Sequence, residues 1–190
     1  INQLIDLLSI LGAFIPQLKG NIMFNDLIDL LKIKSKNIEH YTQYPIALIF
    51  FIMLLLQFPS NLNPDGFSPS YAYALSMSLI FASVFTFIEA AFFIFWFGRI
   101  GKSHSFLTYL HYAVMISIAS QIPAIAVLLI TQSINSSPWI PVIGFLAVFI
   151  YIIYMYSANL ARAVSSSKKY AFVAILIVAL LQFTVQLLIL

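Results

Sequence analysis

The sequence predicts an all-α integral membrane protein: a five-helix transmembrane bundle preceded by one or two interfacial amphipathic helices. Of its 190 residues, 62% are apolar and only 8% are charged, whereas about a quarter of the residues of a soluble domain are charged. The mean hydropathy is +1.01, and several apolar runs approach the roughly 20 residues that cross a bilayer as a helix. These runs are unbroken, unlike the alternating segments of about 10 residues that build a transmembrane β-barrel.

Residues 1–43 are predicted to form a separate N-terminal region on the cytoplasmic side of the membrane. The stretch 3–18 is apolar, but it is short and contains Asp6. We interpret it as an amphipathic helix that lies along the membrane surface. The alternative is that 3–18 forms a short additional span, which would be the sixth.

A second amphipathic helix is predicted within residues 23–40, where leucines recur at helical spacing and acids precede lysines on the other face. Asn25 is the expected N-cap, since its side chain can accept a hydrogen bond from an early backbone N–H. Asp26 and Asp29 would then lie in the first turn and the lysines near the end, which matches the helix dipole.

Residues 44–190 are predicted to form the transmembrane domain. Loops rich in Pro, Asn, Gly and Ser separate its apolar runs, and such residues favour turns. No soluble domain or internal repeat interrupts it. The five spans are predicted at about 44–58, 71–97, 107–130, 139–161 and 170–190.

The basic residues fix the orientation of these spans. With five spans, all nine Lys and Arg residues fall on one side of the membrane, and the positive-inside rule makes that side cytoplasmic. Leu190 then lies outside. The predicted cytoplasmic anchors are Lys32, Lys34, Lys36, Arg99, Lys102, Arg162, Lys168 and Lys169.

No sequence motif for catalysis or cofactor binding is found. The chain has no cysteine, which excludes thiolate nucleophiles and Cys-ligated metals. The phosphate-binding loop GxxxxGK[ST], the dinucleotide-binding GxGxxG, the metalloprotease HExxH and the hydrolase GxSxG are all absent. The histidines are scattered along the chain. We therefore predict no enzymatic activity, no cofactor, no metal site and no nucleic-acid partner.

Glu89 is the one acid that must lie within the membrane, in the stretch "FTFIEAAFFIFWFGRIGK". A charge near the bilayer centre costs about 3 kcal/mol on insertion scales. Two roles are open: a protonated glutamate that joins two helices by hydrogen bonds, or a group that handles a proton or an ion. A transport pathway usually has several polar groups or broken helices, so the joint is favoured.

Helix depth identifies the expected partners of Glu89, which lies about 13 Å from the cytoplasmic end of its span. Tyr154 and Ser117 lie at about 12 and 16 Å in their own spans, and His111 at about 7 Å. We predict an intramembrane polar cluster of these four residues. Pro123 is predicted to kink the third span because it removes a helical hydrogen bond.

The second half of the chain resembles the Yip1 family of small five-span membrane proteins, and in particular its compact bacterial members. The resemblance rests on "GKSHSFLTYLHYAV", on the Pro-containing span "ISIASQIPAIAVLLI", and on "YIIYMYSANLARAVSSSKKYAFVAILIVALL". In that family a Tyr- and Leu-rich span end precedes a Ser/Lys loop and an Ala. The resemblance covers about residues 44–190. The residues of this chain that match these family features are Tyr154, Leu160, Ser165, Lys168 and Ala171.

The resemblance implies a non-enzymatic protein that acts through protein partners or through membrane organisation. It also implies a location in a bacterial inner membrane or, in a eukaryote, in an endomembrane. Eukaryotic members are associated with Rab GTPases and vesicle traffic, and the family has no catalytic residues to carry over. The expected partners are the lipid bilayer and other membrane proteins, or further copies of this chain. Two alternatives stay open: a transport or channel component that uses Glu89, or an accessory subunit of a larger membrane complex.

Overall fold

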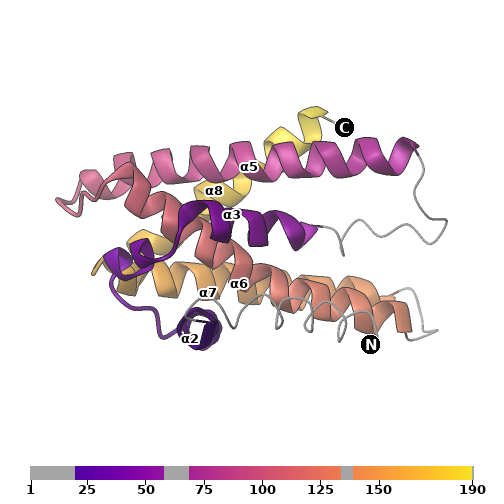
Figure 1. The fold of residues 1–190 in the computed structure, drawn as a ribbon, viewed down its shortest axis with the longest axis horizontal. Helices are drawn as coiled ribbons and strands as arrows, with labels where there is room; N and C mark the ends of the chain where they lie inside the picture. The colour runs from indigo at the N-terminus through magenta and orange to yellow at the C-terminus, as the bar shows by residue number, and fades with distance from the viewer. Residues whose placement is uncertain (1–19, 58–68, 134–138, 190) are drawn as a thin grey trace.

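The computed structural model describes residues 20–57, 69–133 and 139–189, and every regular element in these ranges is a helix (Figure 1). Four long helices lie side by side as a bundle. Three shorter elements precede them and pack against one end and one side of it. The long helices are α5 (Pro69–Gly98), α6 (Phe106–Ser133), α7 (Trp139–Ala163) and α8 (Lys168–Ile189); the shorter elements are α2 (Gly20–Leu31), the 3-10 helix η2 (Ile38–Gln43) and α3 (Ile46–Leu55).

The four long helices are long and apolar enough to cross a membrane, so the chain is a multi-pass membrane protein. Their bounds agree with four of the predicted spans to within about three residues at each end. Large apolar side chains are exposed along α5 and α7, for example Ile80, Phe95, Ile143 and Leu146. In a bilayer these side chains contact lipid tails.

The first predicted span, 44–58, is only partly a helix. The α-helix α3 has 10 residues, or about 15 Å of length, roughly half of what a bilayer core requires. The α-helix does not extend toward the N-terminus, because η2 occupies the preceding turn and Pro45 separates the two. Tyr44 is extended, with φ −88° and ψ 137°, which is the conformation that a following proline imposes.

The amphipathic helix predicted within residues 23–40 is present only in part: α2 ends at Leu31, and it has no acid in its first turn and no lysine in its last, so the predicted match to the helix dipole is wrong. In Figure 1 α2 is seen end-on. Its axis therefore runs across the long helices, as expected for a helix that lies at a membrane surface. It begins at Gly20 rather than after Asn25, so Asn25 lies inside the helix and the predicted N-cap is wrong. The helix predicted at 3–18 lies outside the described residues.

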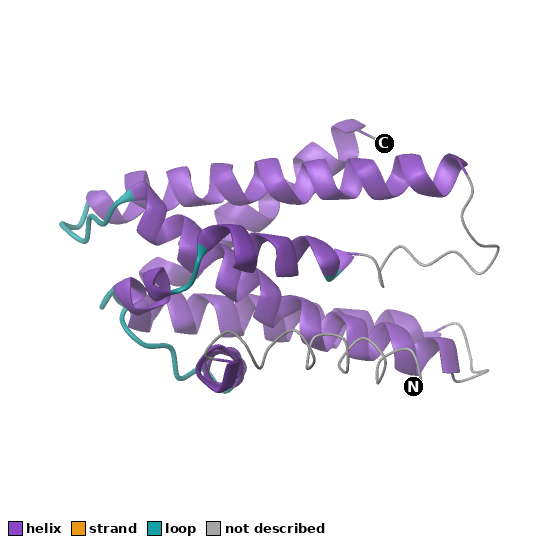
Figure 2. Cartoon of the chain, viewed as in Figure 1, coloured by secondary structure: helices purple, strands orange, loops and turns teal. Residues whose placement is uncertain are grey.

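The described connections between helices lie at one end of the bundle, which we call the basic end. Figure 2 shows the loops that join α2 to η2 and α5 to α6 at this end. The start of α8 lies there too, since the Tyr170 hydroxyl donates to the carbonyl of Trp96 at 2.6 Å. The side chain of His104 in the α5–α6 loop lies 3.4 Å from Glu39 of η2. The basic end therefore joins all parts of the fold.

Three helices finish at the basic end with the same turn. In each, one residue after the helix has a positive φ: 57° at Ile33, 69° at Gly101 and 52° at Ser165. The next backbone N–H then reaches back five residues, as from Lys34 to Asp29 at 2.7 Å, which is the Schellman arrangement that satisfies the last carbonyls of a helix. Only one of the three positions has glycine, the residue that adopts positive φ without strain.

Replacing Ser165 by glycine is expected to stabilise the protein by about 0.5–1 kcal/mol, because it removes the strain of a left-handed non-glycine residue. The matched change, Gly101→Ala, is expected to destabilise by about 1 kcal/mol. A Cβ at Gly101 would meet nothing within 4 Å, so its cost comes from φ alone. Unfolding in detergent with increasing denaturant measures both. A destabilised Ser165→Gly variant would contradict the assignment of strain.

Candidate functional sites

The first polar site surrounds Asp26, whose side chain is 1% exposed. Its carboxylate lies 2.7 Å from the Lys36 ammonium and 2.7 Å from His40 Nε2. The hydroxyl of Tyr44 also donates to it in a short hydrogen bond. One acid of α2 thus fastens the loop, η2 and the start of α3 to that helix. We call this group the Asp26 cluster.

These contacts determine the ionisation of Asp26. Burial on its own raises the pKa of Asp26, but the hydrogen bonds from Lys36, Tyr44 and His40 favour the charged form. Their combined effect is larger, so the pKa of Asp26 lies below its usual value of 3.8. The carboxylate is therefore charged at neutral pH and contributes to the stability of the folded state.

Acid is expected to loosen the Asp26 cluster. Because the folded-state pKa of Asp26 is lowered, its contribution is complete above the unfolded-state value and is lost as the pH falls through the folded value. We expect the protection of α2 amides from hydrogen exchange to be full at about pH 6 and reduced below about pH 4. Asp26→Asn is the control, and its amides should show no such dependence. Equal pH profiles for both proteins would contradict the prediction.

Asn159 on α7 forms the second set of contacts to α2, and it is fully buried. Its amide nitrogen donates to the carbonyl of Leu30 at 2.6 Å, and its amide oxygen accepts from Ser35 N–H at 3.1 Å. The Ser35 hydroxyl donates to the Asn159 backbone carbonyl at 2.8 Å. A single side chain therefore satisfies both the end of α2 and the loop that follows it.

Two more side chains of α7 reach the same helix end. The hydroxyl of Tyr151 donates to the carbonyl of Leu31 at 2.6 Å, and the Arg162 guanidinium donates to that of Ile33. The last carbonyls of a helix have no partner within it, so α7 supplies the missing donors. We call residues 20–45 the N-terminal layer: it is held to α7 by these donors and is tied together by the Asp26 cluster.

The second polar site lies within the bundle and contains Glu89. This residue is on α5 and is 5% exposed, and the hydroxyl of Tyr156 on α7 donates to its carboxyl oxygen. The predicted pairing with Tyr154 is wrong, because that side chain is 54% exposed. The tyrosine that contacts Glu89 is Tyr156, two residues further along the same helix.

Ser117 and His111, the other two predicted partners of Glu89, differ in their position relative to it. Ser117 lines the same cavity as Glu89. His111 lies outside it: its Nε2 is 3.0 Å from the Tyr44 carbonyl, and its Nδ1 is 2.7 Å from the Leu107 carbonyl. His111 therefore helps to fix the start of α3 on α6. The predicted cluster of four reduces to Glu89 and Ser117 around one cavity.

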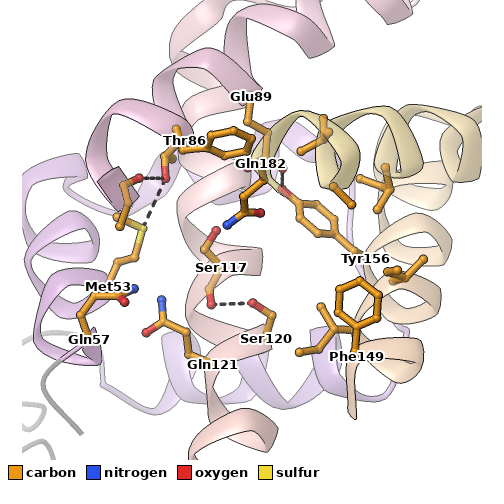
Figure 3. Close-up of a pocket in the computed structure, with 17 residues that line it drawn as sticks. Met53, Gln57, Thr86, Glu89, Ser117, Ser120, Gln121, Phe149, Tyr156 and Gln182 are labelled. Carbon is orange, nitrogen blue, oxygen red and sulfur yellow. Dashed lines mark hydrogen bonds between the residues drawn. The ribbon is translucent and has the colours of Figure 1, made fainter. Parts of the chain in front are cut away.

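A cavity of about 250 Å³ lies between α3, α5, α6, α7 and α8, and Glu89 is part of its wall (Figure 3). We call it the Glu89 cavity. Apolar side chains such as Phe149 and Met53 line the remainder, and Met53 accepts a weak hydrogen bond from Thr86 at 3.7 Å. The other polar residues of the wall are Gln57, Thr86, Ser117, Ser120, Gln121 and Gln182.

Aromatic rings pack between this cavity and the basic end. Phe93 contacts Tyr156 on one side and Tyr109 on the other, with ring centroids 6.2 and 6.1 Å apart. Phe97 stacks on Tyr109 at 6.2 Å and touches Tyr170 at 5.7 Å. Phe93, Phe97 and Tyr109 are each fully buried. These rings separate Glu89 from the loops of the basic end.

The remaining predicted residues are placed as follows. Pro123 lies inside α6, which continues through it from Phe106 to Ser133; the predicted kink stays a prediction. Arg99 lies with its guanidinium carbon 4.2 Å from the centre of the Phe95 ring. All eight predicted anchors are exposed and belong to the basic end: Lys32, Lys34, Lys36, Arg99, Lys102, Arg162, Lys168 and Lys169.

No protein-family model, curated protein or solved structure matches this chain. Within the described ranges, no group of three or more His, Asp or Glu side chains could hold a metal ion. The two polar sites therefore carry the functional argument. Sequence analysis missed the first of them, although an Asn inside a span and an Asp beside a leucine stripe were both visible signals.

Proposed function

We propose that this chain is a non-enzymatic membrane protein that acts at its cytoplasmic face, where it binds membrane-protein partners or organises anionic lipid. The single observation that carries the proposal is the N-terminal layer, which Asn159 holds to the bundle and which the buried Asp26 ties together. A loosely attached surface helix would need neither. The layer places Ile33, which lies between the exposed Lys32 and Lys34, against the exposed Arg162 near the end of α7.

The charge of this face suits an anionic membrane surface. Each Lys or Arg near anionic headgroups contributes about 1 kcal/mol of attraction. The eight exposed basic residues of the basic end act together, and the exposed apolar side chains of α2, such as Ile22 and Phe24, can enter the interface beside them. Lipid headgroups and an acidic segment of a partner would use the same surface.

The proposed topology has five crossings, with the N-terminal layer in the cytoplasm and Leu190 outside. Support comes from the ends of the helices: α3 begins at the basic end, whereas α5 ends there and so begins at the other. The starts of α3 and α5 therefore lie at opposite ends of the bundle. A Yip1-like architecture has this arrangement, and the resemblance rests on the sequence stretches named above.

Purification of the full chain in a mild detergent, followed by mass spectrometry of the accompanying proteins and lipids, tests the proposal. Wild type should retain a reproducible partner or anionic lipid. Asn159→Ala should lose it several-fold, because the layer no longer holds its position. Thr184→Ala is the matched control: it removes an exposed hydroxyl that bonds within α8. Equal retention by Asn159→Ala, or no retention by wild type, would overturn the proposal.

Two alternative functions make different use of the bundle. A transport or channel component is favoured by the Glu89 cavity, which is polar and lies within the membrane. An accessory subunit of a larger complex would instead cover the apolar faces of α5 and α7, and those faces also suit lipid contact. The purification described above distinguishes these two alternatives, because an accessory subunit would be recovered with its complex in fixed proportion.

A further inference from the structure

The polar groups of the Glu89 cavity are arranged along the bundle axis. Glu89 and Tyr156 lie about 13 and 10 Å from the ends of their helices at the basic end. Gln121 and Gln182 lie about 22 and 21 Å from the same end. The carboxyl group of Glu89 therefore lies at the end of the cavity nearer the basic end, and the glutamine amides lie closer to the other half of the membrane. Figure 3 shows Glu89 and Gln121 at opposite ends of the group of side chains.

The wall of the cavity contains one unpaired hydrogen-bond acceptor and one carboxyl group. The side-chain oxygen of Gln121 is buried and has no hydrogen-bond partner among the described residues. Glu89 supplies a carboxyl group, and its titratable neighbours are Tyr156 on α7 and Tyr112 on α6. No Lys, Arg or His is among the described residues that line the cavity. A buried unpaired acceptor costs about 1–3 kcal/mol, so a ligand that donates hydrogen bonds would be favoured.

The size of the cavity limits the ligand. A cavity of about 150 Å³ is sufficient to hold benzene, and the Glu89 cavity has about 250 Å³. It therefore has room for one aromatic ring with a short polar chain. The apolar side chains Phe149, Ile152 and Val178 in the wall suit such a ring, while Glu89 and Gln121 suit a polar end.

We infer that the Glu89 cavity binds a small lipophilic amine, with the ammonium group paired to the Glu89 carboxylate. The ammonium takes the place of the carboxyl proton, which leaves to bulk water, so the site is electrically neutral in both states. A cation buried in a membrane requires a counter-ion, and Glu89 supplies it. An anion would meet no positive side chain in the wall. This site is independent of the function proposed for the cytoplasmic face.

Three probes of equal shape test the inference: 2-phenylethylamine, 2-phenylethanol and phenylacetate. Their equilibrium binding to the full chain is measured in lipid discs of neutral phosphatidylcholine, with empty discs subtracted. The amine should bind saturably and roughly tenfold more tightly than the alcohol or the acid. Equal affinities for amine and alcohol, or no saturable binding at about 1 mM amine, would overturn the inference.

Variants then locate the site. Glu89→Gln should weaken the amine at least about tenfold while leaving the alcohol unchanged. Gln121→Leu should weaken it by a smaller factor, since it removes an acceptor but no charge. Thr184→Ala, outside the cavity wall, is the matched control and should bind as wild type does. Unchanged amine affinity in Glu89→Gln would overturn the inference, and if that variant does not fold, Gln121→Leu and the three-probe comparison still decide it.

Discussion

Asn159→Ala is expected to release the N-terminal layer from the bundle at a cost of about 2–3 kcal/mol. The side chain is fully buried and bonds to the Leu30 carbonyl and to the Ser35 N–H. The Leu30 carbonyl keeps a bond from the N–H of Ile33, but Ser35 N–H loses its acceptor. A buried donor without a partner carries its full desolvation cost.

Hydrogen exchange of residues 20–45 measures this effect, together with unfolding in denaturant. Ser157→Ala is the matched control, because Ser157 is a buried polar residue of the same helix whose hydroxyl bonds within α7, to the Tyr154 carbonyl. It should cost less than about 1 kcal/mol and leave exchange in the layer unchanged. If Asn159→Ala leaves that exchange as slow as in wild type, the proposed attachment is wrong.

Asp26→Ala is expected to cost about 2–3 kcal/mol, which is less than the loss of one partner from a fully buried ion pair. Lys36 is 44% exposed and His40 28% exposed, so water can solvate both after the change. The hydroxyl of Tyr44 is buried and loses its acceptor, which accounts for much of the cost. Asp29→Ala, on the same helix, should cost less than about 1 kcal/mol.

The double variant Asp26→Ala/Asn159→Ala distinguishes two ways in which the layer can be held. If the layer detaches as one unit, the double variant costs little more than the larger single change, because the second contact is already lost. Independent contacts would instead give the sum of the two costs. We expect the layer to detach as one unit, because Asn159 holds the 26-residue segment 20–45 to the bundle and Asp26 ties the same segment together. Additive costs would contradict it.

Hydropathy and charge were sufficient to predict most of the bundle. The long apolar runs gave α5 to α8 with small errors at their ends, because a membrane span is determined mainly by its length and composition. The run at residues 44–58 has the same composition, yet only Ile46–Leu55 forms an α-helix in the described residues. Pro45 sets its start, and composition alone overestimated its length.

The Asp26 cluster and the Asn159 contacts could not be predicted because they depend on how distant segments pack. Asn159 and Leu30 are 129 residues apart in the chain. A single sequence carries no signal for such a pair. Asp26 belongs to the polar face of an amphipathic helix, and that pattern predicted contact with water. The bundle and η2 cover this face instead.

The partner of Glu89 was missed for a geometrical reason. Helix depth limited the choice to the tyrosines of α7, and Tyr154 and Tyr156 differ by only about 3 Å in depth. Residues that are two positions apart in a helix, such as Tyr154 and Tyr156, also point in directions about 200° apart. Only one of these two tyrosines can therefore face Glu89. Depth follows from the sequence, but rotation about the helix axis is decided by packing, which places Tyr156 inside and Tyr154 outside.

The short helix α3 affects how the chain enters a membrane during synthesis. Its 10 residues give about half of the apolar length that a segment needs to stop in a bilayer. It packs against α5 and α6, which follow it in the chain, so its position depends on helices that emerge later from the ribosome. The apolar segment 46–55 is therefore expected to settle only after the helices that follow it. Nascent chains that end before α6 should hold residues 46–55 only weakly in the membrane.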